Sequence, residues 1–454
     1  MFYSLKKGVQ YRCTENYGYI AKLDSGYQLT LDAVGADFIK ELSETPKSLD
    51  EIVDNLVIKY DALREEISKD FLDIATVLQD EGFISVSSTQ DFQEHEERKL
   101  PVINREIPPI TDLTIEITNR CNERCVHCYL ADAKKDNGKK LDISLVKRLI
   151  DEFAQMGGER ITFTGGEPFL HPDLLSAIEY AAQRKLKVAI FSNLISVSTT
   201  QIKILKSLGN IIEIQVSLYS TDSAVHDMIT KVKGSCCRTL TSIERMKDAG
   251  LPIKIACPVM LENKACVFNV IDYAKSQNIA VELEMYINSR EDQSDDNLRH
   301  RMSIEEMSAF MYELMDYDEK LAIEILHRHK NKYDQTYNLV EELNMPLCQA
   351  GYYGLYVTAD GVIAICPNMQ GYALGDINVN NLQDIWIHNQ KLENIRNIRE
   401  CDFKECIRCE ARDYCIRCFA HNYAEAKDIL TMPKYACEMA FATKQIVENR
   451  NNEA

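Results

Sequence analysis

The sequence lacks any apolar run that approaches the roughly 20 residues a membrane-spanning helix needs. Its first residues, Met-Phe-Tyr-Ser-Leu-Lys-Lys, contain no apolar core of a secretory signal. Positive charge is also in short supply, because 52 Lys and Arg face 70 Asp and Glu, which gives a net charge of −18. We therefore expect a cytoplasmic protein without a membrane anchor and without a nucleic-acid-binding surface, which would need basic patches.

Cysteine, by contrast, is abundant. The 454 residues include 16 cysteines, while the hydrophobic content of 45% and the charged content of 27% are those of an ordinary globular protein of several domains. Disulfides are rare in a reducing cytosol, so clustered cysteines there indicate metal ligands.

Three of the cysteines form a compact motif. Cys121, Cys125 and Cys128 have the spacing C-x3-C-x2-C, directly before Tyr129 and just after an apolar, β-rich run at 113–117. A [4Fe–4S] cluster is held by thiolates and usually has four. Three thiolates leave one iron open, and an open iron can chelate the amine and carboxylate of a small ligand and pass it an electron. A zinc knuckle with a distant fourth ligand is the alternative.

From residue 113 onward, β-rich segments alternate with amphipathic helical segments. The expected strands are 113–117, 160–164, 187–192, 211–218, 253–258 and 281–286, and the expected helices are 144–156, 173–184, 199–208, 239–249 and 266–277. This pattern predicts an α/β fold with a parallel, barrel-like sheet, whose functional residues lie at the C-terminal ends of the strands.

A second motif stands at the end of the second expected strand. It comprises Gly165, Gly166, Glu167 and Pro168. Glycines let the backbone approach a ligand closely, and carbonyls at a sheet edge can accept hydrogen bonds from an ammonium group. Together with the cysteine motif one strand earlier, this sequence resembles the radical S-adenosylmethionine (SAM) family. The resemblance implies a partial (β/α)6 barrel, with SAM bound to a cluster on the three cysteines.

The resemblance also implies a set of SAM contacts. They are Tyr129, Gly165, Gly166, Glu167, Pro168, Ser192, Asn193, Ser217, Lys231, Val259 and Met260. Two positions depart from the family pattern, because Leu194 replaces a common glycine and Tyr219 stands where many relatives have aspartate. For Lys231 a place on a helix surface is the alternative, and for Val259 and Met260 it is core packing.

Residues 1–88 form a separate pattern of strands at 9–13, 17–23 and 27–31, helices at 33–42, 48–60 and 63–81, and a last strand at 83–86. This order resembles the PqqD-like recognition element for ribosomally made, post-translationally modified peptides. In that family a leader peptide adds a strand beside the third strand and packs on the third helix, which is β-augmentation. A winged-helix DNA reader is disfavoured by the acidic third helix.

The C-terminal region holds the remaining cysteine pattern. Its members are Cys348, Cys366, Cys406, Cys409, Cys415, Cys418 and Cys437, with hairpin strands expected at 355–358 and 362–365. The pattern resembles the SPASM domain. The resemblance implies an outer cluster on Cys406, Cys409, Cys415 and Cys437, and an inner cluster on Cys348, Cys366 and Cys418. The inner set has three ligands, which suggests an open iron for a substrate thiolate unless Cys401 is the fourth. Two zinc ribbons are the alternative for 406–418.

The expected units are a recognition element at 1–88, a linker at 89–110, a radical SAM partial barrel at 111–287, a helical bridge at 288–345 and a SPASM domain at 346–454. This layout resembles radical SAM maturases that crosslink a precursor peptide, with thioether formation as the expected reaction. Carbon–carbon or carbon–oxygen crosslinking, another oxidation of a peptide residue, and a plain iron–sulfur electron carrier or redox regulator are alternatives. The implied cofactors are three [4Fe–4S] clusters and SAM, and no protein general base is required. The implied partners are a leader peptide bound at 1–88 and an electron donor such as flavodoxin or ferredoxin.

Overall fold

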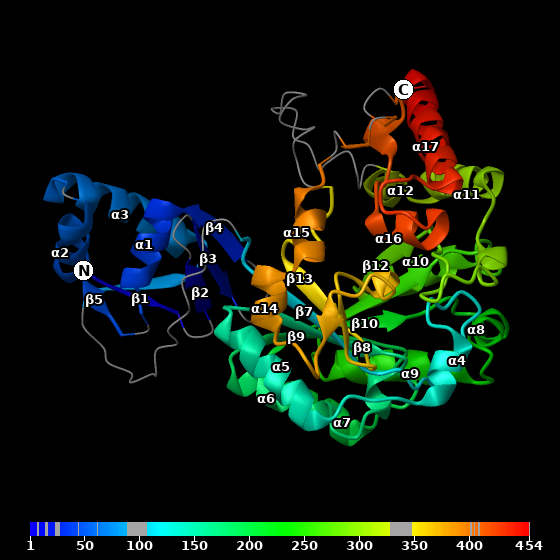
Figure 1. Cartoon of the computed structure of the whole chain (residues 1–454), viewed down its shortest axis with the longest axis horizontal. Helices are drawn as coiled ribbons and strands as arrows, with labels where there is room; N and C mark the ends of the chain where they lie inside the picture. Colours follow the sequence, from blue (N-terminus) through cyan, green and yellow to red (C-terminus); the bar gives the residue numbers. More distant parts are fainter. Residues whose placement is uncertain are drawn as a thin grey trace.

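A computed structural model describes residues 1–6, 9–13, 17–22, 28–43, 45–60, 62–88, 107–326, 347–399, 402–403, 405–406 and 409–453. Figure 1 shows an N-terminal unit beside a large sheet that carries helices, with the C-terminal helix at the far end. The expected linker up to residue 106 lies outside the described residues, as does Cys401, the alternative fourth ligand of the inner cluster. No helix in the described ranges is long and apolar enough to cross a membrane.

The N-terminal unit has the predicted elements and one additional sheet. Its elements are β1 (Phe2–Leu5), β2 (Val9–Cys13), β3 (Tyr17–Lys22), β4 (Gln28–Asp32), α1 (Ala33–Glu41), β5 (Lys47–Ser48), α2 (Leu49–Tyr60), α3 (Arg64–Asp80) and β6 (Ile84–Ser87). Strands β2, β3 and β4 form an antiparallel sheet, as predicted, and β1 pairs with both β5 and β6 in a second sheet that the sequence analysis missed. The unit has its own core, in which Phe71 meets Phe38 edge to face at 5.7 Å.

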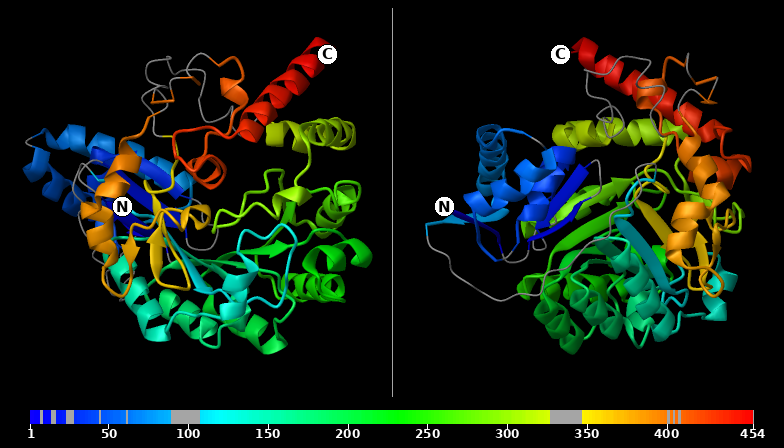
Figure 2. Two further views of the ribbon diagram at one scale, coloured as in Figure 1. Left: turned by 45° about the vertical axis from the view of Figure 1, so that its right-hand side comes forward. Right: turned by 60° about the vertical axis from the view of Figure 1, so that its left-hand side comes forward.

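The predicted parallel strands form most of a nine-stranded sheet. They are β7 (Asp112–Thr118), β8 (Arg160–Gly165), β9 (Lys187–Ser192), β10 (Ile211–Ser217), β11 (Ile253–Pro258) and β12 (Ala280–Glu284). The helices between them are α4 (Asp132–Asn137), α5 (Ile143–Gln155), α6 (Leu174–Gln183), α7 (Thr199–Leu208), α8 (Ser223–Thr230), α9 (Ser235–Asp248) and α10 (Val267–Gln277). The strands lie side by side in chain order (Figure 2), so their C-terminal ends share one edge, and the α/β fold class is confirmed.

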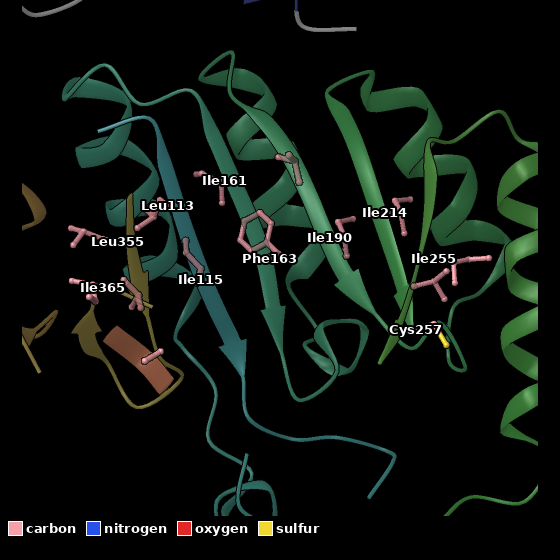
Figure 3. Packing of buried hydrophobic residues seen from close by; sticks show 14 of the residues in the cluster. Leu113, Ile115, Ile161, Phe163, Ile190, Ile214, Ile255, Cys257, Leu355 and Ile365 are labelled. Atoms are coloured by element: carbon pink, nitrogen blue, oxygen red, sulfur yellow. The ribbon is translucent and has the colours of Figure 1, made fainter. Parts of the chain in front are cut away.

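The C-terminal region extends this same sheet. Strands β13 (Gly354–Val357) and β14 (Val362–Ala364) form the predicted hairpin, followed by β15 (Gly375–Asp376). The partial barrel leaves one side of β7 unpaired, and β13 fills it as a parallel strand, with Gly354 opposite Asp112. Figure 3 shows that Leu355 and Ile365 join the core of Leu113 and Ile115. The hairpin expected to belong to a separate domain is therefore continuous with the barrel sheet.

The remaining helices belong to the bridge and to the C-terminal region. They are α11 (Ile304–Tyr317), α12 (Glu319–Leu326), α14 (Leu382–His388), α15 (Gln390–Asn397), α16 (Phe419–His421) and α17 (Lys434–Glu453). Helices α11 and α12 lie within the expected helical bridge at 288–345, whose residues from 327 onward lie outside the described residues. Helix α17 contacts α11, so the last segment of the chain packs against the bridge.

Candidate active site

A cavity of about 340 Å³ opens at the C-terminal ends of the parallel strands. Its wall combines residues of the cysteine loop, of the strand ends and of the C-terminal region. The lining residues are Cys121, Glu123, Cys125, His127, Cys128, Tyr129, Thr164, Gly165, Gly166, Phe191, Ser192, Asn193, Gln215, Ser217, Tyr219, Ala256, Pro258, Glu284, Tyr286, Ile287, Asn288 and Asn368. The structure thus brings together all three predicted cluster cysteines of the loop and six of the predicted SAM contacts in one wall.

The thiols of the cysteine loop lie close together at the cavity wall. Burial, with smaller contributions from the charges of Glu167, Cys128 and Glu123, raises the pKa of Cys121 to about 12. Burial, Glu123 and the other two thiols also raise the pKa of Cys125 well above its usual value. Three facing thiolates in a buried site need positive charge to stabilise them, and an iron–sulfur cluster supplies it. The residues present therefore fit a cluster on Cys121, Cys125 and Cys128.

The glycine motif holds the end of β8 against the start of the cysteine loop. A Cβ atom on Gly165, whose φ is +150°, would lie 2.1 Å from the Thr118 carbonyl oxygen. A Cβ on Gly166 would lie 2.3 Å from the Arg120 carbonyl oxygen, and the Gly166 N–H donates to the Thr118 carbonyl at 2.8 Å. Two chain segments therefore meet with no room for a side chain, which fixes the cavity floor beside the cluster cysteines.

Glu167 acts inside the protein and does not line the cavity. Its fully buried carboxylate accepts hydrogen bonds from the Ser192 hydroxyl and the Asn193 N–H, both at 2.8 Å. It also accepts the Phe169 N–H at 3.0 Å. Pro168 begins the short 3-10 helix Pro168–Leu170 and is buried. Glu167 thus ties the end of β8 to the end of β9 and holds the two predicted SAM contacts of β9 in place.

Three further predicted SAM contacts lie outside the cavity wall. Lys231 is exposed and ends α8 in the left-handed region, with φ +57°. Val259 and Met260 are fully buried after β11, and Met260 belongs to a small cluster with Val126 and Tyr219. Core packing, the alternative left open for Val259 and Met260, fits these positions.

The sequence analysis missed several residues of the wall. Tyr219 donates a hydrogen bond to Cys125 Sγ at 3.6 Å, and its unusual identity after β10 was the only local signal. Asn288 follows β12, and Asn368 lies two residues after Cys366. No local pattern marks these two asparagines, and Asn368 reaches the cavity only because the tertiary fold brings the C-terminal region there.

A buried polar chain adjoins the cavity at Tyr129. The hydroxyls of Tyr129 and Tyr356 lie 3.2 Å apart, and the Tyr356 hydroxyl donates to Glu116 Oε2 at 2.8 Å. Glu116 Oε1 has no hydrogen-bond partner among the described residues. Burial raises the pKa of Glu116 to about 7. The chain links β7, the cysteine loop and β13.

Replacement of Glu116 with glutamine tests this burial. A carboxyl with a raised pKa binds its proton more tightly in the folded protein, so stability is lost as the pH rises from the ordinary pKa towards about 7. E116Q removes this loss, so its stability relative to the wild type should increase by up to about 3 kcal/mol between pH 4 and pH 8. Denaturant titrations of the cluster-free protein at both pH values measure the difference. The exposed α6 variant E179Q is the control, and equal pH dependence of E116Q and wild type would contradict the prediction.

The C-terminal cysteines form two groups in the structure. Burial raises the pKa of Cys366 strongly, and the charges of Cys418 and Cys348 raise it further. Burial likewise raises the pKa of Cys415 to about 12, with contributions from Cys437, Cys406 and Cys409. The electrostatic neighbours are thus the same sets that the SPASM resemblance implies for the inner and outer clusters. Cysteines grouped in these two sets fit cluster binding here as well.

A second cavity, of about 230 Å³, lies between the end of β12 and the C-terminal region. Cys418 lines it, together with apolar side chains such as Met285 and Met439. Three residues, Glu284, Tyr286 and Asn288, line both cavities. The predicted inner-cluster ligand Cys418 therefore faces a space that borders the cavity of the cysteine loop.

Comparison with known proteins identifies three family matches. Residues 115–274 match the radical SAM superfamily, residues 348–411 match the SPASM iron–sulfur cluster-binding domain, and residues 20–84 match PqqD, described as coenzyme PQQ synthesis protein D. This chain therefore contains a radical SAM domain. It has a SPASM domain after its radical SAM domain and a PqqD domain before it. A radical SAM domain binds a [4Fe–4S] cluster and SAM, and the SPASM domain binds further clusters.

Three relatives illustrate the likeness. The antilisterial bacteriocin subtilosin biosynthesis protein AlbA of Bacillus subtilis is 31% identical over 160 residues, which are 35% of this chain and only 36% of AlbA. An AdoMet-dependent heme synthase of Methanosarcina barkeri is 24% identical over 70% of this chain and 94% of its own length. Streptococcus suis SuiB bound to S-adenosylmethionine has a TM-score of 0.68 at 15% identity, covering 96% of this chain and 99% of SuiB. SuiB thus shares the overall fold, including the N-terminal unit.

Proposed function

We propose that this enzyme matures a ribosomally made precursor peptide by forming an oxidative crosslink, most specifically a cysteine thioether. One observation carries the proposal: the cavity beside the cluster cysteines borders a second cavity that Cys418 lines. A peptide spanning the shared residues would have one side chain at the SAM site and another beside the inner SPASM cluster. The PqqD match and the solved complex of SuiB with its precursor peptide SuiA support a peptide substrate.

The chemistry of the site divides between the cofactors and the chain. When bound, the clusters and SAM supply a 5′-deoxyadenosyl radical that takes a hydrogen atom from a peptide carbon, and they accept the electron left when a thiolate bonds to that carbon. Cys121, Cys125 and Cys128 would hold the first cluster, and the thiol proton of the substrate leaves to solvent. Glu167 orients Ser192 and Asn193 towards SAM.

The shared wall positions the substrate between the two sites. The rings of Tyr286 and His421 stack with centroids 3.7 Å apart and nearly parallel planes. The Tyr286 hydroxyl donates to Glu425 at 2.9 Å, and Arg301 pairs with the same carboxylate at 2.7 Å. Because positioning decides which carbon loses hydrogen, a rigid wall between the cavities favours one crosslink over others.

A single assay tests the reaction. The reconstituted enzyme is incubated without oxygen with SAM, a reductant and the peptide encoded beside its gene, and the peptide mass and free thiols are measured. A thioether predicts loss of one pair of hydrogen atoms and of one free thiol per link. The same mass loss with all thiols retained would instead indicate carbon–carbon or carbon–oxygen crosslinking. Absence of 5′-deoxyadenosine would contradict radical chemistry altogether.

Removal of residues 1–88 should separate peptide binding from SAM cleavage. The N-terminal unit has its own core, so the deletion leaves the core of the large sheet intact. We expect the truncated enzyme to cleave SAM at the wild-type rate and to lose measurable affinity for the leader peptide, because the strand it would pair with is gone. Fluorescence anisotropy of a labelled leader measures the affinity, with a scrambled leader as the control.

Retained leader affinity in the truncated enzyme would contradict the recognition role of this unit.

The electron donor of the enzyme, a flavodoxin or ferredoxin, stays a prediction.

A further inference from the structure

Tyr219 lies where the cysteine loop meets the end of β10. Its hydroxyl donates a hydrogen bond to Cys125 Sγ at 3.6 Å. Cys125 is a predicted ligand of the SAM-binding cluster, so this donor acts on a sulfur atom of the cluster itself. We propose that Tyr219 is a positioning residue that raises the reduction potential of this cluster through its hydrogen bond to Cys125.

The tyrosine is held rigidly in place. Its ring packs between His127, edge to face with centroids 4.9 Å apart, and His226, whose centroid lies at 5.3 Å. The Tyr219 N–H donates to His226 Nδ1 at 3.3 Å, and its carbonyl accepts from Asn263 Nδ2 at 3.0 Å. Only 4% of the residue is exposed. These contacts hold the ring in place and keep the hydroxyl directed at Cys125 Sγ.

The hydrogen bond from Tyr219 affects the reduction potential because the charge on the cluster changes when the cluster is reduced. An added electron makes the cluster sulfurs more negative, so a donor to sulfur stabilises the reduced cluster more than the oxidised one. Hydrogen bonds to sulfur are among the factors that set iron–sulfur potentials. A buried hydrogen bond is stronger than an exposed one, since water does not compete for the donor. Loss of the donor should therefore make the cluster harder to reduce.

Glu123 and Ser217 also lie next to Tyr219, and they show how a purely structural role of Tyr219 can be distinguished from an effect on the potential. Glu123 Oε2 lies 3.5 Å from Cys125 Sγ and accepts from the thiol, so it is no donor to a thiolate. Burial and the nearby Cys125 and Glu123 raise the pKa of Tyr219 well above its usual value, while a hydrogen bond from Ser217 lowers it. Ser217 is a predicted SAM contact. If Tyr219 served only to hold Ser217, its loss would weaken SAM binding and leave the potential unchanged.

The test compares Tyr219→Phe with the wild type as full-length, fully reconstituted enzymes. Potentiometric titration followed by electron paramagnetic resonance reports the cluster whose signal responds to SAM. In Tyr219→Phe we expect the equilibrium constant for reduction of this cluster to fall about tenfold, which corresponds to a reduction potential about 59 mV more negative. The affinity for SAM should stay within twofold of the wild type. Tyr286→Phe is the matched control, because Tyr286 lines the same cavity and its hydroxyl donates to Glu425 instead of a cysteine.

A second variant keeps the shape of the residue. Fluorinated tyrosine at position 219 is a stronger donor of nearly the same size, so the potential should become less negative than in the wild type. An unchanged potential in both variants would overturn the proposal, as would lost SAM affinity without a shift in potential. Neither readout depends on peptide modification, so the proposal stands apart from the proposed crosslinking.

Discussion

Replacement of Cys418 with alanine is expected to stop peptide crosslinking while SAM cleavage continues. Cys418 faces the second cavity and lies with Cys366 and Cys348, away from the cysteine loop. Its loss should remove a ligand of the inner SPASM cluster and leave the SAM-binding cluster intact. We expect crosslinked product to fall by about 100-fold or more, while 5′-deoxyadenosine still forms in the same reaction. Mass spectrometry of the peptide and chromatography of the nucleoside measure the two products.

Cys237→Ala is the matched control for this experiment. Cys237 is exposed on α9 and belongs to neither predicted cluster group. Its replacement should leave iron content, SAM cleavage and crosslinking at wild-type levels. Iron content should fall in Cys418→Ala alone. Crosslinking at the wild-type rate in Cys418→Ala would contradict a role for the inner cluster, whereas loss of SAM cleavage would show that the two sites are not independent.

Gly166→Ala is expected to abolish SAM cleavage by a purely steric effect. The added Cβ would lie 2.3 Å from the Arg120 carbonyl oxygen and 2.6 Å from that of Asn119, and backbone atoms cannot turn aside as a side chain can. The end of β8 and the cysteine loop must then separate, which displaces both SAM contacts and cluster ligands. Because misplacement by about 1 Å can cost about 100-fold in rate, we expect at least that loss. Nucleoside formation and SAM binding by calorimetry measure it.

Gly209→Ala gives the comparison without a clash. Gly209 ends α7 with φ +70°, and a Cβ there would meet nothing within 4 Å. Gly209→Ala should lower the free energy of unfolding by about 1 kcal/mol, because alanine disfavours the left-handed backbone conformation. SAM cleavage should be unchanged. If Gly166→Ala also cleaved SAM normally, close packing at the glycine motif would not be what shapes the site.

Local features of the chain were predictable from the sequence, and the structure explains why. The capping box of Ser48 and Glu51 appears with the Ser48 N–H donating to the Glu51 carboxylate at 2.7 Å. The six parallel strands are confirmed, and they were predictable because segments rich in β-branched and apolar residues alternate with amphipathic helical segments. The two short strands β1 and β5 were missed, since their pairing joins residues more than 40 positions apart.

For the site residues, too, the sequence predicted local motifs but not long-range contacts. Glu167 was predicted as part of the SAM-binding motif, yet its carboxylate accepts hydrogen bonds from Ser192 and Asn193 inside the protein. A motif shows which residues occur together but not which of their atoms face the ligand. Asn368 shows the opposite case: it lines the cavity although nothing near it in the chain indicates this.

The sequence by itself determined which chemistry to expect of this protein. The spacing of Cys121, Cys125 and Cys128 and the paired glycines of β8 predict a cluster and its ligand, because thiolate number and backbone clearance are local properties. The tertiary structure alone decided how that chemistry is arranged. The pairing of β13 with β7 brings Asn368 and Cys418 to the open end of the barrel, and the turn after β10 brings Tyr219 to Cys125. Contacts between residues more than 90 positions apart depend on packing of the whole core, and no local pattern records them.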